Sequence, residues 1–200
     1  MTELTDSADP ATARAGAAHS LVAAARAAFD AAACSVSVLD TDGRTLRFLA
    51  VSGAGEGELE GLELPPERGL AYWALRTGMS MAADDLDSAA DFNREFAAST
   101  GYLPSSILVA PIGDGEIPAG VIQVLDRAEA AQSGADPIAL IERFAELAGH
   151  LLGATDVPGR EETQEIADLI RETGSTLLSA RIGDRAEARR LLLDALRDLG

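Results

Sequence analysis

The chain has 200 residues, of which 47% are hydrophobic, so it can bury a core of ordinary domain size. Its formal net charge of −17 repels nucleic-acid backbones and anionic lipid surfaces, which argues against both as partners. A single cysteine, Cys34, excludes an intrachain disulfide and a multi-cysteine metal site. All 16 basic residues are arginine, a usage typical of GC-rich bacterial genomes.

The N-terminus predicts neither export nor membrane attachment. Its first ten residues are polar and acidic, without the apolar segment of a secretory signal. No apolar run in the chain approaches the roughly 20 residues that span a bilayer. We therefore expect a cytoplasmic protein that begins with a flexible N-terminus over residues 1–16.

A helix and a hairpin are predicted first. Residues 11–31 are rich in alanine and carry a narrow apolar stripe, which indicates a helix of modest amphipathicity. Segments 34–40 and 45–52 then alternate between apolar and polar residues, as strands do. Asp42-Gly43 between them is a strong signal for a hairpin turn.

A loop and a short helix follow the hairpin. Segment 53–61 is acidic and rich in glycine, which is typical of a flexible loop. Gly69 and Gly78 bracket a short helix, because glycine often occupies the position that ends a helix. A strand is predicted at 79–84.

The stretch DFNREFAASTGYLPSSILVAPI, residues 91–112, changes its period from helical to strand-like. It predicts a helix over about 89–99, a strand over 106–112 and, between them, a joint rich in hydroxyl groups. We expect this joint to line a pocket, because hydroxyl groups supply the few polar contacts that a buried ligand needs.

The remaining segments complete an α+β pattern. Asp114-Gly115 joins 106–112 to a strand at 119–126, and 138–153 forms a helix with one apolar face. Beyond a linker, two amphipathic helices are predicted at 161–180 and 184–198. The order of elements predicts an antiparallel sheet with helices on both faces, plus a C-terminal helical hairpin.

The runs LPPERGLAYWALRTGMSMAADDL (64–86) and DFNREFAASTGYLPSSILVAPIGDGEIPAGVIQVLDR (91–127) resemble a GAF domain, in particular those of cyclic-nucleotide phosphodiesterases and related bacterial sensors. The resemblance covers residues 17–154 and implies a GAF-like fold that serves as a small-molecule sensor or as a dimerisation module. Residues 1–16 and a helical extension over 155–200 would flank this domain.

The resemblance also implies ligand contacts near the second strand, the short helix, the joint and the last strand. In this sequence those positions are Val51, Ser52, Leu70, Ala98, Thr100, Pro104 and Gln123. The chain departs from the nucleotide-binding pattern, because the acidic residue expected near Ala98 is absent and a proline stands in place of a joint threonine. The class of ligand therefore stays open.

We select seven candidate ligand-binding residues from the resemblance and from the local pattern. They are Ser52, Leu70, Trp73, Phe96, Thr100, Tyr102 and Gln123. Four of them have an ordinary structural alternative. Phe96 and Tyr102 could belong to the core, Trp73 could pack on the sheet, and the hydroxyls of Thr100 and Tyr102 could cap backbone groups.

The sequence shows no catalytic constellation and calls for no cofactor or metal. Cys34 has no histidine nearby in the sequence to activate it as a nucleophile. Three aspartates at 84, 85 and 87 do not have the spacing of a calcium loop. His19 and His150 fall on polar helix faces, which is unlike an axial haem ligand.

The leading hypothesis is a non-enzymatic GAF signalling or regulatory protein that binds an unknown small molecule and signals as a homodimer through its flanking helices. An alternative is a structural dimerisation or adaptor module that binds no ligand and captures a partner protein through residues 160–200. A redox or haem enzyme is a third.

Overall fold

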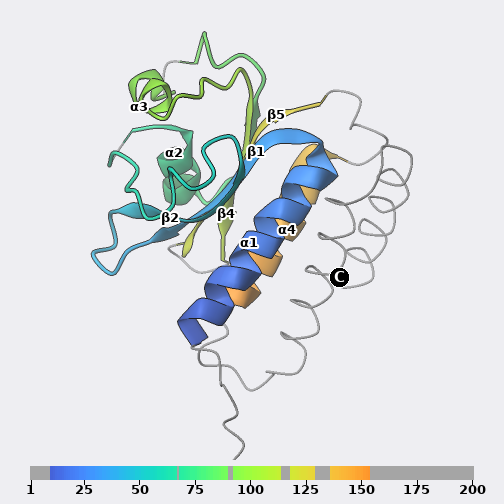
Figure 1. Ribbon diagram of the computed structural model, residues 1–200. Coiled ribbons are helices and arrows are strands. Elements are labelled where there is room, and N and C mark those ends of the chain that lie inside the picture. Colours follow the sequence, from blue (N-terminus) through green and yellow to red (C-terminus); the bar gives the residue numbers. More distant parts are fainter. Residues whose placement is uncertain (1–9, 67, 90–91, 114–117, 129–135, 154–200) are drawn as a thin grey trace, which may run out of the picture.

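The computed structural model describes residues 10–66, 68–89, 92–113, 118–128 and 136–153. They form a five-stranded antiparallel sheet with helices on both faces (Figure 1). The strand order is β2-β1-β5-β4-β3. The predicted α+β class is thus confirmed, whereas the predicted C-terminal helical hairpin lies outside the described residues.

Each element predicted between residues 11 and 153 is present. The helices are α1 (Pro10–Phe29), α2 (Leu70–Thr77), α3 (Arg94–Ser99) and α4 (Pro137–Gly153). The strands are β1 (Ala31–Leu39), β2 (Leu46–Gly53), β3 (Met81–Ala83), β4 (Ile107–Ile112) and β5 (Gly120–Arg127).

Two boundaries differ from the predicted ones. Helix α1 begins at Pro10, one residue before the predicted helix, and so includes residues 10–16 of the predicted N-terminal segment. A proline at the start of a helix is tolerated because the N–H that it lacks would have no partner there. Helix α3 is only six residues long and begins after Asn93, whose side-chain oxygen accepts a hydrogen bond from the Phe96 N–H at 3.1 Å. An N-cap of this kind fixes where a helix starts.

One face of the sheet is covered by α1 and α4, which lie side by side (Figure 1). Their buried residues and the sheet residues beneath them form one core cluster. Phe29 of α1 and Phe144 of α4 meet in this cluster with their ring centroids 6.2 Å apart. None of the described helices is long and apolar enough to cross a membrane.

The other face of the sheet carries α2, α3 and the loops around them (Figure 1). A second core cluster forms there between α2 and residues of β2, β4 and β5. The hydroxyl of Tyr72 accepts a hydrogen bond from the Leu46 N–H at 3.0 Å and donates one to the Leu64 carbonyl at 3.3 Å. This tyrosine therefore ties α2 to the edge of the sheet.

A β-bulge in β2 sets which side chains face α2 and α3. Val36 pairs with Ala50 and Ser37 pairs with Phe48, so Leu49 is an extra residue in β2. A bulge of this type shifts the alternation of side chains by one position. As a result Phe48 and Val51, three residues apart, lie on the same face of the sheet.

Both edges of the sheet offer few free backbone groups to which another strand could bond. Residues 61–64 run along β2, where the Phe48 N–H bonds to the Leu62 carbonyl at 3.0 Å and the Leu64 N–H to the Leu46 carbonyl at 2.8 Å. At the opposite edge, β3 is only three residues long. Covered edges and short edge strands are two of the ways in which proteins avoid pairing with foreign strands.

Candidate functional site

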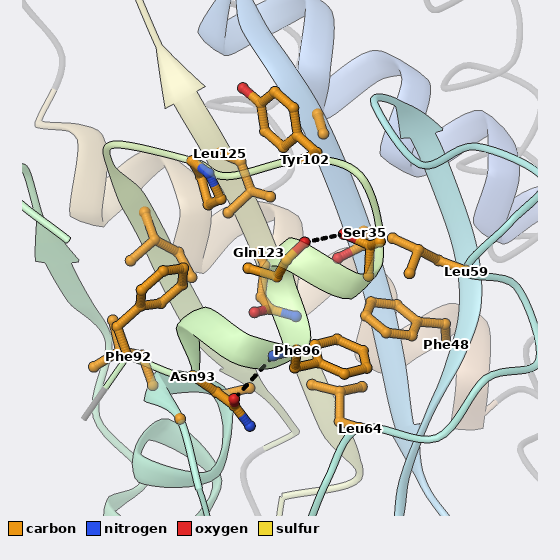
Figure 2. A pocket seen from close by; sticks show the side chains of 18 of the residues that line it. Ser35, Phe48, Leu59, Leu64, Phe92, Asn93, Phe96, Tyr102, Gln123 and Leu125 are labelled. Atoms are coloured by element: carbon orange, nitrogen blue, oxygen red, sulfur yellow. Dashed lines mark hydrogen bonds between the residues drawn. The ribbon is translucent and has the colours of Figure 1, made fainter. Parts of the chain in front are cut away.

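A hollow of about 100 Å³ lies between the sheet and the segments that carry α2 and α3 (Figure 2). Its floor is formed by β1, β2, β4 and β5, and its walls by the loop after β2, the start of α2, helix α3 and the joint that follows α3. The strands supply Ala33, Ser35, Phe48, Val51, Ile107, Gln123 and Leu125. The pocket that the sequence predicts beside residues 99–106 is therefore present, with Thr100, Tyr102 and Pro104 in its lining.

Two polar side chains lie on the floor of the hollow. Ser35 of β1 and Gln123 of β5 are direct cross-strand partners, and both line the hollow (Figure 2). They are only 7% and 8% exposed. Among the described residues, neither side chain has a hydrogen-bond partner within the protein. An amide and a hydroxyl thus face an otherwise apolar hollow without a hydrogen bond to the described residues, while the one described side-chain polar atom that is wholly buried without a partner is Ser37 Oγ.

One wall of the hollow is aromatic. Phe48 of β2 and Phe96 of α3 stack with their ring centroids 6.4 Å apart and an interplanar angle of 7°. Phe92 adds a third ring (Figure 2). The Asn93 cap holds α3 in register, so that Phe96 points at the sheet. Flat apolar side chains of this kind provide large contact area to a planar or aliphatic ligand.

The joint after α3 is fixed by Asp126, which follows the last floor residue of β5. Its carboxylate accepts hydrogen bonds from the backbone N–H groups of Ser105 and Ser106 at 2.8 and 2.9 Å. It also accepts from the hydroxyls of Tyr102 and Ser105. The hydroxyl groups predicted to face a ligand are therefore largely engaged in holding the joint to the sheet.

These hydrogen bonds change the acidity of the groups involved. Burial alone would raise the pKa of Asp126, but the hydrogen bonds from Tyr102, Ser105 and Ser106 outweigh it, so the pKa lies below its ordinary value. Burial and the bond to this carboxylate raise the pKa of Tyr102 to about 12. Tyr102 therefore stays protonated and Asp126 stays ionised across the neutral range.

Among the residues that the structure describes, Arg68 is the one charged residue in the lining, and its exposure places it at the entrance to the hollow. The next lining residues along the chain are Gly69, Leu70 and Ala71, which begin helix α2. Gly69 is the N-cap of that helix, with no side-chain hydrogen bond to the first turn. The acidic loop 53–61 also contributes to the wall, through Ala54 and Leu59.

The structure brings together five of the seven residues that we selected from the sequence. Leu70, Phe96, Thr100, Tyr102 and Gln123 all line the hollow. Whether they contact a ligand stays a prediction.

Ser52 and Trp73 are not in the lining. Ser52 pairs with Cys34 and lies beyond the bulge, so that alternation along β2 directs it toward the face covered by α1. Trp73 packs half-buried against the second core cluster.

The residues that sequence reasoning missed share one property: their role depends on distant partners. Ser35 matters because β1 places it beside Gln123. Phe48 matters because it stacks on Phe96, which lies far along the chain in α3. Arg68 and Asn93 flank helices whose ends were only approximately predicted. Asp126 lies inside β5, where Arg127 still pairs with Ala31, and its hydrogen-bond partners are some 20 residues earlier in the chain, so no local signal marks its role.

The groups considered for other chemistry are placed away from the hollow. Cys34 is fully buried on the α1 side, and burial raises the pKa of its thiol. His19 Nε2 lies 2.6 Å from Glu60 Oε1, and neither His19 nor His150 lines the hollow. Within the described ranges, no group of three or more His, Cys, Asp or Glu residues could hold a metal ion.

The family of the chain follows from comparison with known proteins. A family model described as GAF domain matches residues 14–152. The chain therefore belongs to the GAF domain family, a known small-molecule-binding signalling fold. No curated protein matches the chain.

Solved structures agree with this assignment. The second GAF domain of DevS from Mycobacterium smegmatis is 24% identical, with a TM-score of 0.53 over 74% of this chain and 96% of that chain. The PixJ GAF domain from Thermosynechococcus elongatus, in its blue-light absorbing form, is 17% identical, with a TM-score of 0.54 over 88% and 100% of the two chains. A type II free methionine-R-sulfoxide reductase from Thermoplasma acidophilum is 22% identical, with a TM-score of 0.49 over 64% and 82%. At these identities the likeness shows the fold alone.

Proposed function

We propose that this protein is a non-enzymatic GAF signalling or regulatory protein, bacterial and cytoplasmic, that binds a small molecule in the hollow. The observation that carries the proposal is the pair of polar side chains on the floor, Ser35 and Gln123, which face the hollow and make no hydrogen bond to the described residues. A ligand that fills the hollow without bonding to them leaves each a buried polar group without a partner, at a cost of about 1–3 kcal/mol. A ligand that supplies these hydrogen bonds avoids this cost and is thereby selected over purely apolar compounds.

The distribution of reactive groups favours binding over catalysis. A nucleophile needs an adjacent base and a site for developing charge. Cys34, the single cysteine, is buried on the opposite face of the sheet, and the Asp126 carboxylate is occupied by the joint that it holds. None of the described residues of the lining is a carboxylate, a histidine or a cysteine.

The position of the floor supports a route for the signal. Ser35 faces the hollow, whereas its neighbours on β1, Cys34 and Val36, belong to the core beneath α1 and α4. A change in the floor is therefore transmitted through one strand to the helices on the far face. We further propose that these helices, together with residues 155–200, form the contact between two copies of the chain.

A ligand screen by thermal shift tests the proposal. A compound present at 100 times its Kd stabilises the folded state by about 2.7 kcal/mol. For a chain of this size that raises Tm by roughly 5–11 °C. Ser35→Ala should weaken the binding of such a compound. Ser52→Ala is the matched control, because Ser52 is equally buried, at 7%, on the opposite face of the same strand pair.

Two results would count against ligand sensing. In the first, no compound stabilises the protein and side chains close the hollow in a crystal structure. In the second, Ser52→Ala weakens binding as much as Ser35→Ala does. The first result would favour the adaptor alternative, in which deletion of residues 160–200 abolishes capture of a partner protein. Light scattering on the full chain tests the homodimer directly.

A further inference from the structure

We propose that the ligand of the hollow is a small organic anion: a carboxylate on a compact apolar body that carries a second polar atom. This inference rests on the proposed function and specifies the chemistry of the same site. It is built from the entrance, the walls and the floor of the hollow in turn.

The entrance provides a positive charge in a strongly acidic protein. Arg68 is the one charged residue among the described residues of the lining, and no ion pair ties it to another described residue. The net charge of −17 repels anions at long range. That field is screened over about 8 Å at physiological ionic strength, so the groups beside the entrance decide what binds there. An arginine presents a planar pair of donors that matches the geometry of a carboxylate.

The start of α2 adds donors of its own. The first N–H groups of a helix have no partner within it, and the helix dipole places partial positive charge at this end. In α2 the N-cap is Gly69, which has no side chain that could accept a hydrogen bond from the first turn. The first hydrogen bond along the helix runs from the Trp73 N–H to the Gly69 carbonyl at 3.1 Å. Leu70 and Ala71, the first two helical residues, line the hollow. An anion beside Arg68 would therefore also meet uncapped backbone donors.

The walls limit the rest of the ligand to a small apolar body. The stacked Phe48 and Phe96 rings are joined in the lining by Leu59, Leu64 and Phe92. The volume of about 100 Å³ is somewhat below that of a cavity of about 150 Å³ that binds benzene. One ring or a branched aliphatic chain matches this space, with the carboxylate projecting toward the entrance. A cyclic nucleotide or a tetrapyrrole is far larger.

The two polar side chains on the floor of the hollow favour a ligand with a second polar atom. Gln123 and Ser35 are more than nine-tenths buried, and both lack partners among the described residues. The amide of Gln123 can donate and accept, and the hydroxyl of Ser35 can do either. A ring hydroxyl or an oxo group on the ligand would satisfy them. Aromatic hydroxy acids and branched-chain 2-oxo acids are two classes of compound that combine all three features.

The test compares acids with neutral compounds of the same shape. The full chain is titrated by calorimetry with 4-hydroxybenzoate and 3-methyl-2-oxobutanoate, and with the amide of each. We expect at least one acid to bind about tenfold or more tightly than its amide, which corresponds to about 1.4 kcal/mol. Arg68→Gln should reduce this preference to about twofold or less. Arg76→Gln is the control, because Arg76 is an exposed arginine in the last turn of the same helix and outside the lining.

Several outcomes would overturn the inference. These are equal binding of acid and amide to the unaltered protein, an acid preference that survives Arg68→Gln, and a preference that Arg76→Gln removes as well. Binding of neutral compounds in place of acids would refute the anion while leaving the hollow as a ligand site. Binding by none of the four compounds refutes the anion class, and only the wider thermal-shift screen then decides whether the hollow binds anything.

Discussion

Replacing Asp126 by glycine tests how much its hydrogen bonds contribute to the stability of the protein, apart from the strain of its backbone. This residue has a φ of 49°, a left-handed conformation that costs a residue with a side chain about 1 kcal/mol. Asp126→Gly removes that strain together with the carboxylate. Asp30 is the control, because it is also left-handed, with a φ of 47°, and its exposed side chain has no hydrogen bond among those described.

The two glycine variants should differ widely in their free energy of unfolding. In Asp30→Gly, relief of strain is offset by the greater freedom of the unfolded chain, so stability should change by less than about 0.5 kcal/mol. Asp126→Gly also loses the hydrogen bonds to Ser105, Ser106 and Tyr102. Bonds to a charged acceptor contribute about 1.5–3 kcal/mol each when buried. Because this carboxylate is half-exposed, we expect a total loss of about 3 kcal/mol, or a fall in Tm of roughly 6–12 °C.

Thermal and urea unfolding of both variants measure the loss of stability. Unfolding of Asp126→Asn at several pH values measures how the contribution of the Asp126 carboxylate depends on pH. The pKa of Asp126 is lowered in the folded state. Its contribution is therefore complete above the unfolded carboxyl pKa of about 3.9 and is lost as pH falls through the lower folded value. The stability gap between the unaltered protein and Asp126→Asn should close in that acid range. An Asp126→Gly protein as stable as Asp30→Gly would show that the joint does not depend on this carboxylate.

Three further predictions concern the sheet and the cores. Gly120→Ala places a Cβ 2.2 Å from the Ser37 carbonyl oxygen, so urea unfolding should show a loss of at least about 2 kcal/mol, and an unchanged midpoint would contradict the close approach of β1 and β5. Tyr72→Phe leaves the Leu46 N–H without its partner and should cost about 1–3 kcal/mol in the same assay; an effect below about 0.5 kcal/mol would mean that this hydrogen bond is unimportant. The thiol of Cys34 is fully buried, so it should react with a thiol reagent only after denaturation, and rapid reaction of the native protein would contradict its placement.

The architecture could be predicted from the sequence because its signals are local. Period-two alternation marked β1 and β2, and the Asp42-Gly43 turn joined them. The loop is longer than a two-residue turn, because it is closed by the Asp40 N–H, which bonds to the Thr45 carbonyl at 2.8 Å. Within it Asp42 accepts hydrogen bonds from the Arg44 and Thr45 N–H groups, and Gly43 has a φ of 67°. Such features lie within a few residues of one another, so the printed sequence contains them.

The site could be predicted only in part, because it depends on register. No sequence pattern predicts the extra residue at Leu49. Because of this bulge, Val51 faces the hollow and Ser52 faces the opposite side of the sheet. Similarly, the pairing of Ser35 with Gln123 joins strands that are far apart in the sequence. The hydroxyl-rich joint was located correctly. Its principal partner, Asp126, lies some 20 residues further along the chain and could not be recognised by spacing.

The covered edge of β2 and the brevity of β3 leave the sheet little opportunity to grow by adding a strand from another molecule. Two copies that associate would therefore contact each other through side chains on helices or loops. They would not form a continuous ladder of backbone hydrogen bonds. Such contacts can shift by a small rotation and re-form, which is what the proposed ligand sensing requires of a contact between two copies.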